Sequence, residues 1–170
     1  MSEGTDGIEQ SEQTQEVKLS PEELKENAQT LLGSYLNHET VKSAKFQETV
    51  DSTNKDRVIK RSTLYGGTGL DRDQKITIVE IKGQPVQVTH ETSAGGVMPS
   101  RKEIHITSDP DGKNSIQAFD FGPGGSYRGS RYIEPRIEKQ GIDSNIAVGM
   151  AENMLAKIPQ PVKVAAPVAA

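Results

Sequence analysis

The densest group of side chains with binding chemistry lies in the glycine-rich stretch 122–136. Tyrosine rings stack on nucleic-acid bases and arginine guanidinium groups neutralise phosphates, so this stretch predicts a weak nucleic-acid site. The alternative is a solvated sheet face, on which arginine and tyrosine side chains stack across neighbouring strands. The candidate binding residues are Tyr127, Arg128, Arg131, Tyr132 and Arg136.

Three histidines, His38, His90 and His105, are the candidates for metal binding. Glutamate directly follows the first two, but no second histidine comes four residues later, so the helical zinc-protease pattern is absent. In the alternating segment 86–90 the histidine shares a face with two valines, which predicts a hydrogen-bonded core histidine. His105 lies between two isoleucines and should point to the opposite face from them. We therefore expect no metal site.

The patterns of the common catalytic and cofactor sites are also missing. Without cysteine, the chain has no thiolate nucleophile, thiolate zinc site or disulfide. Residues 124–129 resemble the G-x-S-x-G pattern of a nucleophile elbow, but the glycine after Ser126 comes three residues later instead of two. Residues 66–69 are followed neither by the Lys-Ser/Thr of a phosphate loop nor by a third dinucleotide-fingerprint glycine. We expect no cofactor and favour a non-enzymatic protein, although a polar site assembled from distant strands would leave no linear motif.

Charge divides the chain into an acidic front and a mildly basic remainder. Residues 1–40 hold nine acidic and two basic residues, a charge of −7, whereas the rest hold 18 basic and 15 acidic residues, a charge of +3. Residues 1–19 contain almost nothing to bury and are predicted to be a disordered acidic leader. Prolines among small residues predict a Pro/Ala-rich tail at 159–170, which leaves a single domain at 20–158.

Two helices are expected at the ends of this domain. The sequence SPEE at 20–23 is a capping box with proline in the first turn, and the apolar residues after it have helical spacing up to about Asn37. Gly33 inside this helix costs about 1 kcal/mol relative to alanine, so it should either pack closely or fray the helix. A second apolar stripe predicts a C-terminal helix at about 143–158, ended by Pro159.

Between the helices the apolar period changes from helical to alternating, which predicts about seven strands. Their connections are short and carry turn glycines such as Gly83 and Gly112, so neighbouring strands should run antiparallel. We predict an α+β fold: an N-terminal helix, an antiparallel meander that forms an open curved sheet, and a C-terminal helix, with both helices on one sheet face. The alternative is a small up-and-down barrel, which has no edges. The predicted strands are 44–50, 58–64, 76–81, 86–89, 104–106, 116–121 and 127–133.

The chain shows neither a signal-peptide pattern nor an apolar run of about 18 residues, so we expect a cytoplasmic protein without a membrane span. The missing catalytic patterns and the two predicted tails favour a non-enzymatic protein-interaction module, an adaptor or structural protein with a protein partner. The first alternative is a carrier of a small apolar ligand within the curved sheet or barrel. The second is the weak nucleic-acid binder that uses the segment 124–136.

Overall fold

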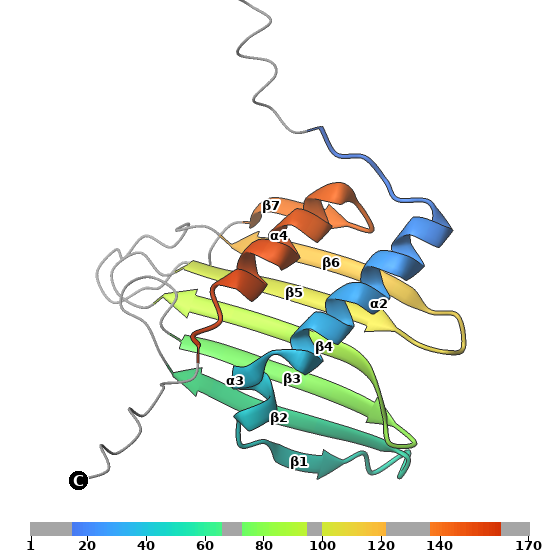
Figure 1. Cartoon of the computed structure of the whole chain (residues 1–170), viewed down its shortest axis with the longest axis vertical. Helices are drawn as coiled ribbons and strands as arrows, with labels where there is room; N and C mark the ends of the chain where they lie inside the picture. Colours follow the sequence, from blue (N-terminus) through green and yellow to red (C-terminus); the bar gives the residue numbers. More distant parts are fainter. Residues whose placement is uncertain (1–14, 66–72, 95–99, 122–136, 161–170) are drawn as a thin grey trace, which may run out of the picture.

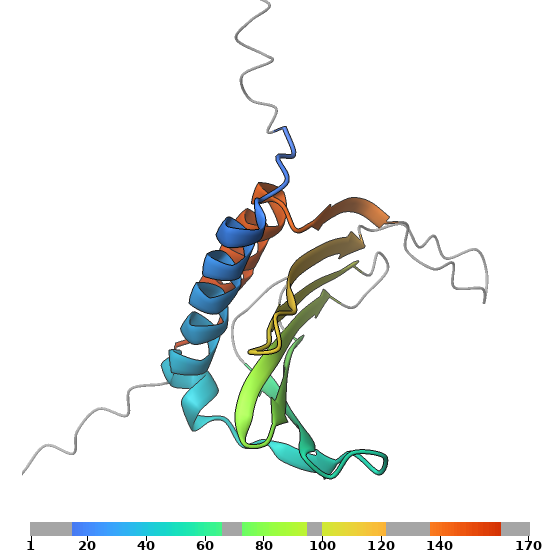
Figure 2. The same cartoon turned by 90° about the vertical axis from the view of Figure 1, so that its right-hand side faces the viewer.

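A computed structural model describes residues 15–65, 73–94, 100–121 and 137–160. These residues form two layers, a sheet and a pair of helices packed against one of its faces (Figure 1 and Figure 2). The helices are α2 (Pro21–Asn37), the short α3 (Glu39–Ser43) and α4 (Asn145–Ala156). The strands are β1 (Gln47–Val50), β2 (Arg57–Tyr65), β3 (Asp73–Ile81), β4 (Gln84–Ala94), β5 (Ser100–Ser108), β6 (Asn114–Phe121) and β7 (Ile137–Ile142).

The seven strands pair in chain order, each antiparallel to the next. The turn between β3 and β4 consists of Lys82 and Gly83, both with positive φ, the backbone geometry that two-residue hairpins require. Because the order runs from β1 to β7 without closing, these two strands are the edges of the sheet that the described residues form. The predicted α+β fold with an open antiparallel sheet is confirmed, and the barrel alternative is wrong.

The last strand is not the one that the sequence predicts. The predicted seventh strand, 127–133, lies outside the described residues, and the strand that pairs with β6 is β7. β7 reads IEKQGI and has apolar residues only at its two ends, so it carries no alternating pattern. Its pairing depends instead on tertiary contacts, since Gly141 lets the first turn of α4 lie directly on the strand.

Helix α2 begins at the predicted capping box. The Ser20 hydroxyl accepts a hydrogen bond from the Glu23 backbone N–H at 3.2 Å, and the Glu23 carboxylate accepts one from the Ser20 N–H at 3.1 Å. The helix ends at Asn37, as predicted, and buries Ala28, Leu31, Leu32 and Tyr35 on one face.

Gly33 neither packs closely nor interrupts α2, because a Cβ at this position would meet nothing within 4 Å. Gly33→Ala should therefore stabilise the protein by about 1 kcal/mol, the difference in helix propensity between the two residues. Urea unfolding measures this directly. A loss of stability would contradict the open space that the structure shows around Gly33.

Contacts with the rest of the fold begin before the predicted domain start at residue 20. Val17 and Asn145 exchange hydrogen bonds, and the Leu19 N–H donates to the Asp143 carbonyl at 2.9 Å. Residues 15–19, assigned by the sequence to the leader, therefore run beside the start of α4. Residues 1–14 and 161–170 lie outside the described part of the chain.

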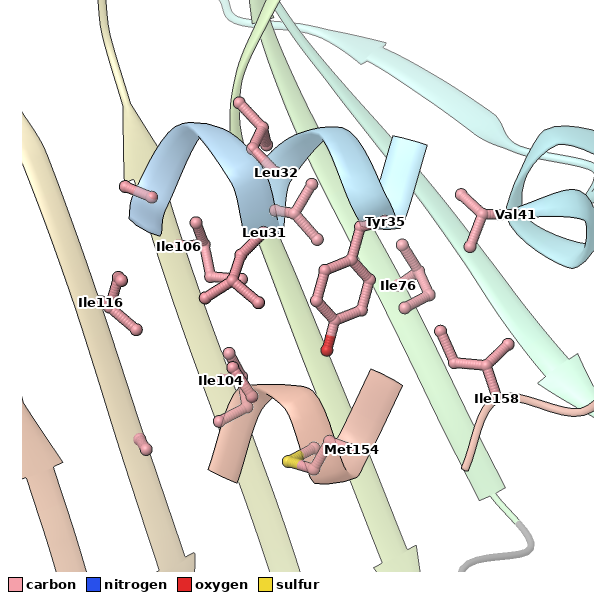
Figure 3. Close-up of a cluster of buried hydrophobic side chains, with 14 of the residues drawn as sticks. Leu31, Leu32, Tyr35, Val41, Ile76, Ile104, Ile106, Ile116, Met154 and Ile158 are labelled. Atoms are coloured by element: carbon pink, nitrogen blue, oxygen red, sulfur yellow. The ribbon is translucent and has the colours of Figure 1, made fainter. Parts of the chain in front are cut away.

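The core lies between the helices and the sheet face that they cover (Figure 3). Alternate residues of the strands form one side of this core, and residues of α2 and α4 form the other. Burying each of the larger apolar side chains stabilises the fold by about 1.5–3 kcal/mol. The intervening residues of the strands face away from the helices, and we call this side the open face. The buried strand residues of the core are Leu64 of β2 and, on β3 to β6, Ile76, Ile78, Val88, Ile104, Ile106, Ile116 and Ala118.

Candidate functional site

A chain of buried polar groups crosses the core beneath α2. Tyr35 Oη lies 2.8 Å from His90 Nδ1, and His90 Nε2 lies 2.9 Å from Gln74 Oε1. The Gln74 amide nitrogen in turn donates to the Lys157 carbonyl at 3.0 Å. Since that nitrogen is a donor, we assign Nε2–H of His90 as the donor to Gln74 and the Tyr35 hydroxyl as the donor to Nδ1.

This chain of hydrogen bonds has a structural role. Burial raises the pKa of the Tyr35 hydroxyl, which keeps it protonated and able to donate. His90 is fully buried and is hydrogen-bonded through both ring nitrogens. The prediction of a core histidine is confirmed, and the network ties α2 and the end of α4 to β3 and β4.

The open face carries the side chains with unused binding capacity. Glu91 of β4, Glu103 of β5 and Phe119 of β6 are direct neighbours in register across three strands. His105 lies two residues along β5 on the same face. We call the whole group the open-face cluster, and its members are Glu91, Arg101, Glu103, His105, Phe119 and Phe121.

Two carboxyl groups lie side by side in this cluster. The Glu103 side chain is only 18% exposed, and its ion-pair contact among the described residues is Arg101 Nε at 3.9 Å. Burial, followed by a hydrogen bond shared with Glu91, raises the pKa of Glu103 against the opposing attraction of Arg101. Like charges directly opposite on a sheet destabilise it. The Glu91–Glu103 pair therefore favours the state in which one of its carboxyl groups is protonated. A cation that binds there in addition to Arg101 would reduce the same repulsion.

Aromatic rings line the pair on its β6 side. The Phe119 and Phe121 rings stack with centroids 6.3 Å apart, and His105 meets Phe119 edge-on at 5.8 Å. The Arg101 guanidinium lies 4.4 Å from the centroid of Phe121, a cation–π geometry. The cluster thus combines acceptor oxygens with flat apolar surface.

The two strand histidines belong to opposite faces of the sheet, as their alternation predicts. His90 is paired in register with Ile104, and His105 with Thr89. Burial lowers the pKa of His105, with partial opposition from Glu91, so the ring is neutral at pH 7. Within the described segments, no three histidine or acidic side chains are arranged to hold a metal ion.

The binding residues that the sequence predicts, Tyr127, Arg128, Arg131, Tyr132 and Arg136, lie outside the described residues. The structure therefore leaves that prediction as it stands. Sequence reasoning missed Glu91 and Glu103 as a pair. Alternation alone places both side chains opposite to the core residues His90 and Ile104, but the register that sets them side by side has no linear signal.

Glu103→Gln should stabilise the protein at pH 7 by about 0.5 kcal/mol, because it removes a like-charge cross-strand pair. The pKa of Glu103 is raised in the folded state, so its stabilising contribution is full in acid and is lost as pH rises through that pKa. The variant and the wild type should converge near pH 3, below the reference pKa of about 4.3. Urea unfolding at both pH values measures the difference, and equal stability at pH 7 would contradict the assigned repulsion.

No family model, curated protein or solved structure shows significant similarity to this chain. No helix in the described part is both long and apolar enough to cross a membrane.

Proposed function

We propose that the protein is a non-enzymatic interaction module that binds an arginine-bearing segment of a partner protein on the open face of its sheet. The observation that carries this proposal is the Glu91–Glu103 pair, two carboxyl groups held in register beside an aromatic wall. A guanidinium fork presents parallel N–H donors that match carboxylate oxygens, and its flat faces stack on aromatic rings.

The cluster already contains one example of the proposed contact. Arg101 stacks on Phe121 while its Nε approaches Glu103, so arginine, phenylalanine and glutamate occur together on this face. Phe119 stands beside Phe121 and directly opposite Glu103 in register. A partner arginine that stacks on Phe119 would repeat this arrangement one position away and would place its guanidinium over both carboxyl groups.

The apolar-carrier alternative has less support in the geometry. The covered face of the sheet is filled by side chains of α2 and α4, and the open face is lined mainly by polar or titratable groups. An apolar ligand would have to lie on that mixed surface without a closed interior, because the sheet does not close.

Nucleic-acid binding is the second candidate, and one observation favours it. Phe119 and Phe121 stack on the open face at the end of β6, immediately before the predicted Arg/Tyr segment. Stacked aromatics on an antiparallel sheet are a common platform for single-stranded bases. The two acidic side chains on the same face oppose phosphate, which is why we place this candidate second.

The test uses a blocked pentapeptide with a central arginine, and the same peptide with citrulline, which keeps the shape without the charge. NMR titration should shift the amides of β4, β5 and β6 around the cluster with the arginine peptide. Citrulline should weaken binding about tenfold, equivalent to ~1.4 kcal/mol. Affinity should rise with pH as Glu103 ionises.

The matched variants separate this site from general charge. Glu91→Gln with Glu103→Gln should abolish the response, whereas Glu26→Gln with Glu152→Gln, exposed acids on the helices, should leave it unchanged. Equal losses in the two double variants would refute a specific arginine site. A single-stranded oligonucleotide that shifts the same amides while the peptide does not would favour the second candidate.

A further inference from the structure

A cavity of about 720 Å³ lies along β2, beside the segment that follows α3. β1 pairs only with residues 58–61 of β2, so the rest of β2 continues past it with no β1 neighbour. The volume falls within the range of about 300–1,000 Å³ that is usual for small-molecule sites. We call this space the β2-edge cavity.

Among the described residues, three cationic side chains and no carboxylate line the β2-edge cavity: Lys45, Arg61 and Lys75. None of the three forms an ion pair within 4.0 Å with any residue that the structure describes. Glu91 faces Lys75 in register across β3 and β4, yet the two side chains stay beyond that distance. Cations gathered around one space without partners create a positive potential that attracts an anion.

Hydroxyl groups complete the polar lining. Ser62 and Thr63 belong to β2, where Ser62 is buried and Thr63 is exposed, so the two hydroxyls lie on opposite faces of the sheet. Thr40 and Ser43 of α3 donate to backbone carbonyls and keep oxygen lone pairs free. A ligand here would meet donors for its charged oxygens and hydroxyls for a polar body, together with apolar surface that includes Ala44 and Leu64.

We infer that the β2-edge cavity binds a small phosphorylated metabolite with a polar body, of the sugar-phosphate class. Arg61 supplies a planar fork for two phosphate oxygens, and Lys45 and Lys75 of the same lining supply further positive charge. Thr63, which lies on the same face of the sheet as Arg61 and directly opposite Lys75 in register, offers its hydroxyl to a hydroxyl of the sugar. This site adjoins the open-face cluster, since Lys75 lies opposite Glu91, but it differs in chemistry from the arginine-binding proposal because it uses cations to hold an anion.

The experiment titrates ribose 5-phosphate, with ribose as the uncharged control, and follows backbone amides by NMR. The phosphate ester should shift the amides of residues 44–47 and 61–64 and of Lys75, and ribose should not. Lys45→Gln with Arg61→Gln should weaken binding about tenfold or more. Lys42→Gln with Lys113→Gln removes the same charge from exposed positions outside the cavity and should leave affinity within about twofold.

Lys45 and Arg61 are exposed, so their replacement should not disturb the fold. An unchanged circular dichroism spectrum of the double variant checks this. The inference is overturned if no cavity amide moves up to about 10 mM ligand. It is equally overturned if ribose produces the same shifts, or if the two double variants lose affinity alike. None of these results bears on the arginine peptide, whose probe has the opposite charge.

Discussion

Replacing His90 with leucine should destabilise the fold by about 3 kcal/mol. Leucine fills a similar volume but takes away the partner that lies 2.8 Å from the buried Tyr35 hydroxyl, and it also removes the 2.9 Å hydrogen bond to Gln74. Each buried polar group left without a hydrogen bond costs roughly 1–3 kcal/mol. Urea unfolding monitored by circular dichroism measures the loss.

Two variants control this prediction. His105→Leu makes the same chemical change on the open face, where the ring has a 3.5 Å contact with the Thr89 hydroxyl and an edge-on contact with Phe119 that leucine can replace by apolar packing, and it should cost less than about 0.5 kcal/mol. Tyr35→Phe combined with His90→Leu removes one orphaned group and should recover about 1 kcal/mol. Strictly additive losses in that double variant would contradict the Tyr35–His90 hydrogen bond.

Gly141→Ala should destabilise the protein by about 2 kcal/mol, the middle of the range for overpacking a filled interior. A Cβ on Gly141 would lie 2.9 Å from the Ala147 backbone nitrogen, 3.1 Å from Ile146 Cγ2 and 3.2 Å from the Ser144 hydroxyl. The nearest of these is backbone, so the first turn of α4 would have to move away from β7. That movement also disturbs the Ser144 cap, whose hydroxyl accepts from the Ala147 N–H.

Gly149→Ala is the matched control for this substitution. Gly149 lies in α4 itself and is exposed, and a Cβ at this position would meet nothing within 4 Å, so alanine should stabilise the helix by about 1 kcal/mol. The same glycine-to-alanine change should thus have opposite signs at two positions eight residues apart. A stabilising Gly141→Ala would show that β7 and α4 do not pack as closely as the structure has them.

The elements with strong local signals were predictable from the sequence. The capping box at Ser20 and the apolar stripe that includes Leu31 and Tyr35 mark α2, and both act within a few residues of chain. Alternation in 86–90 places His90 on the core face, because side-chain direction in a strand depends only on parity. These local rules were sufficient for the order of elements and for the layer that the helices form.

The remaining features depend on contacts between distant segments. β7 has apolar residues only at Ile137 and Ile142, and residues 15–19 are held in place by hydrogen bonds to 143–145. Neither leaves a periodic pattern. The pairing of Glu91 with Glu103 depends on the register of β4 and β5, which a one-residue slip would change for every side chain.

The most direct measurement is the titration of the Glu103 carboxyl carbon by NMR, with and without the arginine pentapeptide. A guanidinium seated on the Glu91–Glu103 pair stabilises the ionised carboxylate, so the peptide should lower the pKa of Glu103, and the citrulline peptide should not. We therefore expect the arginine peptide to lower the pKa of Glu103 and to release protons when it binds. An unchanged Glu103 titration at a peptide concentration that saturates the amide shifts would contradict the assignment of the open-face cluster as the binding site.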